Sequence, residues 1–289
     1  MKQITVISGK GGTGKTILTA SFAVLAKNKV MLDCDVDAAD LYLLLHPVVK
    51  ERYEFRSGKT AIIDKKLCRE CGQCISNCRF KAISDNFMID ALACEGCALC
   101  GYICPYGAIQ MEENISGEWY VSKTEYGPFV HAKLGIAEEN SGKLVTKIRQ
   151  AAKELAERQS LSYVIIDGPP GIGCPVIASL SGVDLAVIIT EPTLSGIHDL
   201  ARVAEVAEYF KIKTKVIINK FDLNLQNSKA IESTCEKKNI EVLGNIPFSP
   251  CVSKAIVEKV PPVSYCRDGV AREIISIWEK IENEVSREK

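Results

Sequence analysis

One short glycine-rich stretch, lying between an apolar run and a helix-like run, constrains this chain more than any other feature. The apolar run covers residues 4–7, and a helical pattern covers residues 17–26. Between them the chain reads Gly-Lys-Gly-Gly-Thr-Gly-Lys-Thr, which is the G-x4-G-K-[ST] pattern of a phosphate-binding loop. Glycines let backbone N–H groups turn toward phosphate oxygens, and a helix N-terminus adds partial positive charge. The stretch predicts a nucleotide site, and a glycine turn without a ligand is the alternative.

The residue types in this loop predict the role of each side chain. Lys15 is expected to reach the β- and γ-phosphates, and the Thr16 hydroxyl is expected to bind Mg²⁺. The expected cofactors of this site are therefore ATP and Mg²⁺. The predicted nucleotide-binding residues of the loop are Gly9, Lys10, Gly11, Gly12, Thr13, Gly14, Lys15 and Thr16.

Buried-looking strands alternate with helices in the rest of the chain, which predicts an α/β fold. Apolar strand patterns recur at 30–33, 163–166, 185–190, 215–219 and 241–246, and amphipathic helix patterns lie at 142–158, 198–210, 228–238 and 272–285. Continuous apolar strands between helices favour a mostly parallel sheet covered on both faces. A turn is expected at residues 57–58, and short strands are expected at 119–121 and 129–133.

Eight of the 13 cysteines lie close together and interrupt this alternation after the second strand. They form two copies of the C-x2-C-x2-C-x3-C run, offset by 26 residues, which is the bacterial ferredoxin pattern. In that pattern the fourth cysteine of each run binds the other cluster, so we predict two [4Fe–4S] clusters, with zinc as the alternative. The expected ligand sets are Cys68, Cys71, Cys74 and Cys104 for one cluster, and Cys94, Cys97, Cys100 and Cys78 for the other. The one departure from the pattern is Arg79, which stands where the ferredoxin run has proline and removes no ligand.

These observations divide the chain into an interrupted nucleotide-binding domain and an inserted α+β ferredoxin-like domain. The expected boundaries are 1–58 and 116–289 for the P-loop ATPase domain and 59–115 for the insert. The formal net charge is +0, so no overall basic field favours nucleic acid or anionic lipid as a partner. No apolar run approaches the length of a membrane span. We therefore expect a cytoplasmic protein that binds neither nucleic acid nor membrane.

Lys10, directly after the first glycine, is not required by a general phosphate-binding loop. With it the loop resembles the deviant Walker A motif of the MinD/ParA/Mrp and nitrogenase-iron-protein class, and the resemblance covers essentially the whole chain. The resemblance implies an ATPase that forms an ATP-dependent dimer, with itself or with a paralogue, in which Lys10 acts in trans. It also implies catalytic roles for Lys10, Lys15, Asp35 and Asp167.

The resemblance extends to residues that follow other strands. Asp33 and Asp167 are expected to help hold Mg²⁺ and Asp35 to position the attacking water, with helix N-caps and a plain strand-end turn as alternatives. The N–H of Gly171 is expected to sense the γ-phosphate. On the base side the resemblance implies Asn219, for which a turn-capping role is the alternative, and Pro247.

The remaining cysteines and the last helix have plainer interpretations. Cys174 is interpreted as a small buried residue, and the alternative is a cluster or redox role at a dimer interface. Packing roles are expected for Cys34, Cys235, Cys251 and Cys266. The last helix is expected to pack on the core through Ile274, Ile275, Ile277, Trp278 and Ile281, because its net negative charge does not suit anionic lipid.

Together these features predict an ATPase whose nucleotide state is coupled to electron transfer or to the maturation of a metallocluster in a partner protein. One alternative is a carrier or scaffold of iron–sulfur clusters with ATP-controlled release. Another is a spatial positioning ATPase of the MinD or ParA kind.

Overall fold

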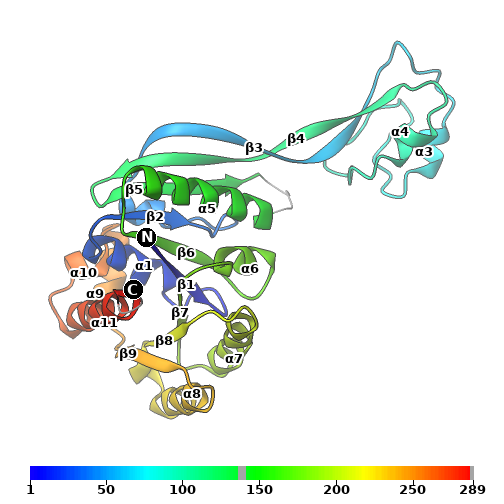
Figure 1. Ribbon diagram of the computed structural model, residues 1–289. Helices are drawn as coiled ribbons and strands as arrows, with labels where there is room; N and C mark the ends of the chain where they lie inside the picture. Colours follow the sequence, from blue (N-terminus) through cyan, green and yellow to red (C-terminus); the bar gives the residue numbers. More distant parts are fainter. Residues whose placement is uncertain (136–140, 287–289) are drawn as a thin grey trace. The chain divides into compact units, whose positions relative to one another are not determined.

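The computed structural model describes residues 1–135 and 141–286 and divides the chain into two compact units (Figure 1). We call them the sheet unit, which comprises Met1–Arg52, Trp119–Lys133 and the chain from Ser141 onward, and the cysteine insert, which comprises Tyr53–Glu118 with a short stretch from Leu134. The predicted insert boundaries of 59 and 115 lie inside the second unit.

The strands form one sheet in the order β3-β4-β5-β2-β6-β1-β7-β8-β9. Adjacent strands from β5 through β2, β6, β1, β7 and β8 to β9 pair in parallel, as the sequence predicts for an α/β fold. The strands are β1 (Lys2–Ser8), β2 (Lys29–Asp33), β3 (Val48–Ile63), β4 (Ile109–Thr124), β5 (Gly127–Leu134), β6 (Tyr163–Pro170), β7 (Leu185–Thr190), β8 (Thr214–Asn219) and β9 (Glu241–Ile246).

Most helices of the sheet unit lie between successive strands, and α9, α10 and α11 follow the last strand. They are α1 (Lys15–Leu25), α2 (Tyr42–Leu45), α5 (Ser141–Arg158), α6 (Cys174–Leu180), α7 (Leu194–Tyr209), α8 (Leu225–Lys237), α9 (Pro250–Val257), α10 (Pro262–Tyr265) and α11 (Gly269–Ser286), with a 3₁₀ turn η1 (Phe221–Leu223). No helix in the part of the chain that the structure describes is long and apolar enough to cross a membrane.

Alternate residues of β1 point to opposite faces of the sheet, and helices cover both faces. On one face, Ile4 and Val6 belong to a buried core with residues of α1 and α11. On the other face, the Thr5 hydroxyl donates to the carbonyl of Ser179 in α6 at 3.0 Å. Burial on both sides explains why β1 is rich in apolar residues, and the one polar side chain in residues 4–7, Thr5, has its hydroxyl bonded.

The predicted packing of the last helix is confirmed except at one position. Ile274, Ile277, Trp278 and Ile281 are buried, and the Trp278 ring lies 5.4 Å from the ring of Phe22 in α1. Ile275 is exposed, because it falls on the opposite side of the helix from this apolar stripe.

Three predictions about elements are wrong or incomplete. The expected turn at 57–58 is absent, because β3 continues through it over 16 residues. The short strand expected at 119–121 is the end of β4, which also spans 16 residues. Finally, α6, α9 and α10 are helices of at most eight residues that the hydrophobic pattern did not reveal, since fewer than three turns show little periodicity.

The cysteine insert repeats its backbone geometry along with its sequence. Its two short helices, α3 (Gln73–Asn77) and α4 (Leu99–Ile103), begin at equivalent positions of the two copies. Left-handed backbone conformations recur at the same 26-residue offset, at Glu70 and Gly96, Gly72 and Ala98, and Lys81 and Gly107. The two copies are joined reciprocally, because Asp64 N–H donates to Ala108 and Asp90 N–H donates to Ala82, each at 2.8 Å.

Candidate functional site

The glycine loop lies between the end of β1 and the start of α1, as predicted. Gly12 and Gly14 take left-handed conformations with φ of 80° and 93°, and Gly14 immediately precedes the helix. Gly9 allows a close approach of the chain, because a Cβ there would lie 2.4 Å from the Cβ of Asp199 in α7. Both requirements explain the glycines at these three positions. The loop lies at a helix N-terminus, where anions bind well.

Lys15 and Thr16, the first two residues of α1, meet Asp167 of β6. The ammonium of Lys15 donates to Oδ1 of Asp167 at 2.8 Å, and the hydroxyl of Thr16 donates to Oδ2 at 2.8 Å. Burial lowers the pKa of Lys15, but the nearby carboxylates of Asp167 and Asp35 outweigh burial and raise the pKa overall. Lys15 is therefore held in its charged form, which suits contact with phosphate.

The two aspartates after β2 have different environments. Asp33 is buried, and its two carboxylate oxygens accept backbone N–H groups from Asp35 and Leu41 at 3.0 and 3.3 Å. Asp33 thus bonds to the backbone of the loop after β2 and is not a side-chain N-cap of α2, whose N-cap residue is Leu41. Asp35 lies 3.6 Å from the Lys15 ammonium and lines the pocket. Burial raises the pKa of Asp35 to about 6, partly offset by Lys15.

Lys10 is held within its own chain by the loop that follows β7. Its ammonium lies 2.7 Å from Glu191 and donates to the hydroxyls of Thr193 and Ser195 at 3.0 and 2.9 Å. Glu191 also accepts from Lys220 at 3.0 Å. Burial by itself raises the pKa of Glu191. The hydrogen bonds and charges of the two lysines have the larger opposite effect, so the pKa lies below its usual value. Sequence reasoning missed Glu191 and Lys220, because strand-end residues acquire this role only when their strands become neighbours.

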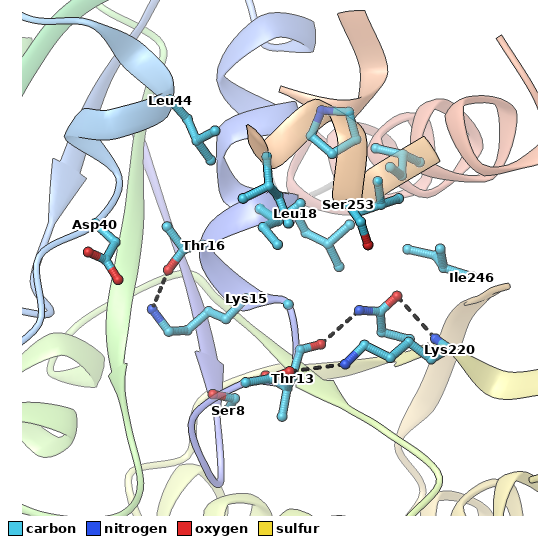
Figure 2. Close-up of a pocket in the computed structure, with 18 of the residues that line it drawn as sticks. Ser8, Thr13, Lys15, Thr16, Leu18, Asp40, Leu44, Lys220, Ile246 and Ser253 are labelled. Carbon is cyan, nitrogen blue, oxygen red and sulfur yellow. Dashed lines mark hydrogen bonds between the residues drawn. The ribbon is translucent and has the colours of Figure 1, made fainter. Parts of the chain in front are cut away.

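A pocket of about 700 Å³ opens from the glycine loop toward the carboxyl ends of β8 and β9 (Figure 2). Of the predicted nucleotide-site residues, its lining includes Gly11, Gly12, Thr13, Gly14, Lys15, Thr16, Asp35, Asn219 and Pro247. Gly9, Lys10, Asp33, Asp167 and Gly171 are not among its lining residues. The volume falls in the range of pockets that hold small-molecule ligands and cofactors.

Two of the predicted contacts are engaged elsewhere in this structure. The N–H of Gly171, expected to sense phosphate, donates instead to the carbonyl of Ser8 at 2.8 Å. The amide of Asn219 donates to the carbonyl of Thr13 at 2.8 Å, and its oxygen accepts the N–H of Lys220 at 3.1 Å. Asn219 thus ties β8 to the glycine loop and keeps one amide hydrogen for a ligand.

The side of the pocket where the base is expected is built from α9 and its neighbours, of which the sequence predicted only the segment 246–248. Val252, Ser253 and Ile256 of α9 line it, together with Phe248 before the helix. A disulfide joins Cys251 of α9 to Cys266 after α10. The expectation of plain packing roles for these two cysteines is therefore wrong. They are 15 residues apart in the sequence, and only the turn between α9 and α10 brings them together.

The cysteine insert contains two small cavities, each lined by one of the predicted ligand sets. The first is lined by Cys68, Cys71, Cys74 and Cys104, and the second by Cys78, Cys94, Cys97 and Cys100, with Cys74 at its edge. The crossover of Cys78 and Cys104 between the copies matches the exchange that the spacing predicts. The sulfur atoms of these two cysteines accept equivalent hydrogen bonds. The N–H of Ala82 donates to Cys78, and the N–H of Ala108 donates to Cys104, each at 3.4 Å.

The donor chemistry of these cavities suits an iron–sulfur cube. Each is lined by the four thiols of one set and by a single glutamate, Glu70 or Glu95, with no imidazole, and soft thiolates favour such clusters. Within residues 1–135 and 141–286, no three His, Cys, Asp or Glu side chains are grouped as ligands of a single ion.

Three other cysteines lie outside these cavities. Cys34 and Cys235 are buried, as expected for packing residues, and burial raises the pKa of both thiols. Cys174 is exposed at the first position of α6, so its interpretation as a small buried residue is wrong.

Comparison with known proteins places this fold and pocket in a family. The CbiA family, described as the CobQ/CobB/MinD/ParA nucleotide binding domain, matches residues 4–263. The chain belongs to this family of nucleotide-binding domains, and the match agrees with the resemblance noted from the glycine loop.

Individual relatives extend over nearly the whole chain. An uncharacterized protein of Methanocaldococcus jannaschii is 34% identical over 290 residues, covering 96% of each protein. An iron-sulfur cluster carrier protein of Pyrococcus abyssi is 22% identical over 307 residues, covering 99% of this chain and 88% of that protein. The solved structure of the septum site-determining protein MinD of Pyrococcus horikoshii, complexed with Mg-ADP, has a TM-score of 0.61 at 18% identity, covering 98% of this chain and 97% of that one.

Proposed function

We propose that this protein is an ATPase that carries two [4Fe–4S] clusters and couples its nucleotide state to electron transfer to, or metallocluster maturation in, a partner protein. The observation that carries the proposal is the pair of four-cysteine cavities in a chain that also has a phosphate-binding loop and pocket. The family match and the Mg-ADP complex of a protein with this fold support the nucleotide part.

The nucleotide side requires a rearrangement around Lys15. In the described conformation this lysine and Thr16 are both bonded to Asp167. Phosphate oxygens entering the pocket compete for the lysine, because a charge-assisted bond to phosphate replaces the one to the carboxylate. Thr16 and Asp167 provide the hard oxygen donors that Mg²⁺ prefers, and the ion would neutralise developing charge during phosphoryl transfer.

Asp35 is proposed to orient the attacking water. It lines the pocket next to Lys15, and its pKa of about 6 leaves it ionised at neutral pH while keeping it more basic than an ordinary aspartate. Asp33 is proposed to hold Asp35 in position, because the carboxylate of Asp33 accepts a hydrogen bond from the backbone N–H of Asp35. We therefore assign Asp33 a positioning role and leave Asp35 as the residue that contacts water.

Lys10 is proposed to serve the nucleotide of a second copy, or of a paralogue, across a dimer interface. Its present contacts with Glu191, Thr193 and Ser195 are all within one chain. For Lys10 to reach a partner's phosphates it must leave Glu191, whose charge Lys220 continues to neutralise. Dimer formation is then favoured only when bound triphosphate offers Lys10 a stronger anionic site.

The insert supplies the redox part of the proposal. When bound, the two clusters would each accept or give one electron. The chain contributes four thiolates per cluster, and the N–H groups of Ala82 and Ala108 donate to Cys78 and Cys104. Such N–H···S contacts stabilise the thiolate charge and are among the interactions that tune cluster potential.

A second candidate function is an iron–sulfur cluster carrier with ATP-controlled release. The specific observation in its favour is the similarity to the Pyrococcus abyssi carrier protein. Cys71 and Cys97 are also exposed, one in each set, so an acceptor could reach a ligand of either cluster.

One set of measurements tests both candidates. Anaerobically purified protein is analysed for iron and sulfide, and its EPR spectrum is recorded after reduction, with and without Mg·ATP. We expect about eight iron atoms per chain and a signal or potential that changes with nucleotide. Zinc without iron, or no uptake of Mg·ATP in calorimetry, would end the proposal. Transfer of labelled iron to an apo-protein while the reduced clusters remain silent would favour the carrier.

A further inference from the structure

The two copies within the cysteine insert differ in surface chemistry despite their shared backbone. Residues 64–81 carry five cationic and two anionic side chains, whereas the equivalent residues 90–107 carry two anionic side chains and no cationic one. The difference is largest at the turn leading into the first three cysteines. There Lys65, Lys66 and Arg69 of the first copy correspond to Ala91, Leu92 and Glu95 of the second.

Backbone geometry does not account for this difference, because the two turns are built alike. The N–H of Lys66 donates to the carboxylate of Asp64 at 2.8 Å, and the N–H of Leu92 donates to that of Asp90 at 2.9 Å. Lys66 and Leu92 are both exposed, Leu92 to 83%. The same turn therefore presents a cation beside one cavity and an apolar side chain beside the other.

The cations of the first copy are not neutralised by the protein itself. Among the residues described, neither Lys66 nor Arg69 forms a salt bridge with a carboxylate, and both are exposed. Lys65 is fixed nearby, since its ammonium donates to the carbonyl of Asn86 at 2.7 Å and lies 5.9 Å from the centre of the Phe87 ring. Arg69 also lines the cavity of Cys68, Cys71, Cys74 and Cys104.

We infer that Lys66 and Arg69, together with Lys65, form a docking surface for an acidic electron-carrier protein. Unpaired surface cations attract an acidic partner and orient it, while a small interface lets it leave quickly, which suits a transient redox encounter. Docking there places the partner against the first cavity and leaves the second copy, which exposes Leu92 and Tyr102, to a different contact. This inference depends on the proposed function, because it takes the first cavity to hold a cluster.

The test measures binding by the iron-loaded, full-length protein in isothermal titration calorimetry. The probe is an acidic plant-type ferredoxin, titrated at several salt concentrations, and an acidic protein of similar size and charge without a redox group is the comparison probe. The test variant is Lys66→Glu/Arg69→Glu. Lys229→Glu/Lys237→Glu, which reverses two exposed lysines of α8, is the control with the same change in net charge. Leu92→Ser/Tyr102→Ser tests the apolar side of the second copy.

We expect the Kd of the ferredoxin for the test variant to rise about tenfold at low salt, and the difference to shrink as salt screens the charges. The α8 control and the Leu92/Tyr102 variant should bind as the unaltered protein does. The inference is overturned if the unaltered protein does not bind the ferredoxin at low salt. It is also overturned if the α8 control weakens ferredoxin binding as much as the test variant does. The same holds if only the Leu92/Tyr102 variant weakens binding, or if the ferredoxin and the comparison probe bind with equal affinity.

Iron content separates this inference from the proposed function. Every variant is checked for iron and for Mg·ATP binding, which should match the unaltered protein, since Lys66 and Arg69 contribute no cluster ligand. An unaltered protein without iron contradicts the proposed function whatever its affinity for the ferredoxin. An iron-loaded protein whose ferredoxin affinity ignores the substitution contradicts only the docking surface.

Discussion

The nucleotide pocket and the cysteine cavities are supported by very different amounts of protein. The pocket belongs to a sheet unit whose buried core joins residues from most of its strands and from α1, α2 and α11. Among the described residues of the cysteine insert, the buried members of its apolar cluster are Ala61, Cys74, Ile83, Phe87 and Ile109, and one of these is itself a predicted cluster ligand.

This difference indicates what each region needs from its ligand. The sheet unit buries a large apolar core, so we expect it to fold without nucleotide, and Lys15 of the glycine loop is already paired with Asp167. A core as small as that of the insert supplies little stability, and natural domains of this size are commonly completed by metals or disulfides. We therefore expect nucleotide to rearrange a formed site and cluster binding to be coupled to folding of the insert.

The largest expected effect comes from removing the buried ligand of the first cavity. Cys74→Ser should lower iron content by about half, because one of the two clusters loses a ligand. It should also speed hydrogen exchange of the amides of the insert, because Cys74 is a buried residue of its core. Amide protection in the sheet unit and Mg·ATP binding should not change. The control is Cys174→Ser, an exposed cysteine outside both cavities. Full iron content in the Cys74 variant would contradict the predicted ligand set.

The next largest effect concerns Lys10. Replacing this lysine tests whether ATP hydrolysis needs a residue from a second chain. Lys10→Ala should lower the ATP hydrolysis rate by about 10³-fold and abolish ATP-dependent dimerisation, since a cation supplied in trans contributes at this scale. Glu191→Gln should act in the opposite direction, raising hydrolysis at low protein concentration by releasing Lys10. Lys27→Ala, at an exposed position, is the control. Unchanged hydrolysis and dimerisation in the Lys10 variant would refute the trans role.

The disulfide of the sheet unit gives an intermediate effect that should spare the insert. Replacing Cys251 or Cys266 by serine should lower the free energy of unfolding of the sheet unit by about 3 kcal/mol, the size expected for a loop of this length. Chemical denaturation with and without a reductant measures it, and reductant should remove the difference between variant and unaltered protein. Equal stability under non-reducing conditions would contradict a structural role for the bond.

The smallest effect is the pH dependence of hydrolysis set by Asp35. Burial raises its pKa to about 6, so the carboxylate is ionised above that pH and protonated below it. We expect the hydrolysis rate to fall about tenfold per pH unit below this value, as the group loses its capacity to accept a proton or hydrogen bond. Because the folded-state pKa is above the unfolded one, ionisation of Asp35 also lowers stability as the pH rises toward 6.

A pH–rate profile from 5 to 8 measures this effect, with iron absorbance recorded in parallel to show that the insert is unaffected over the range used. Asp35→Asn should be slow throughout and should lose the step in the profile. A step that persists in the Asn variant would assign the titration to another group.

Much of this protein could be predicted from its sequence because the signals are local. The glycine loop needs only a strand before it and a helix after it, and the parallel strands are marked by continuous apolar runs. The cysteine spacing is itself a local repeat, and its crossover of Cys78 and Cys104 follows from the motif. At these points the sequence neighbours are also the spatial neighbours.

Tertiary structure alone decided the contacts between residues that lie far apart in the chain. The bond between Lys10 and Glu191, the link of Asn219 to the glycine loop, and the Cys251–Cys266 disulfide all depend on which strand or helix becomes a neighbour. It also decided the engagement of the Gly171 N–H by Ser8, which no local pattern shows. The physical reason is that chain spacing fixes geometry over a few residues, while sheet order and helix packing set the distances beyond them.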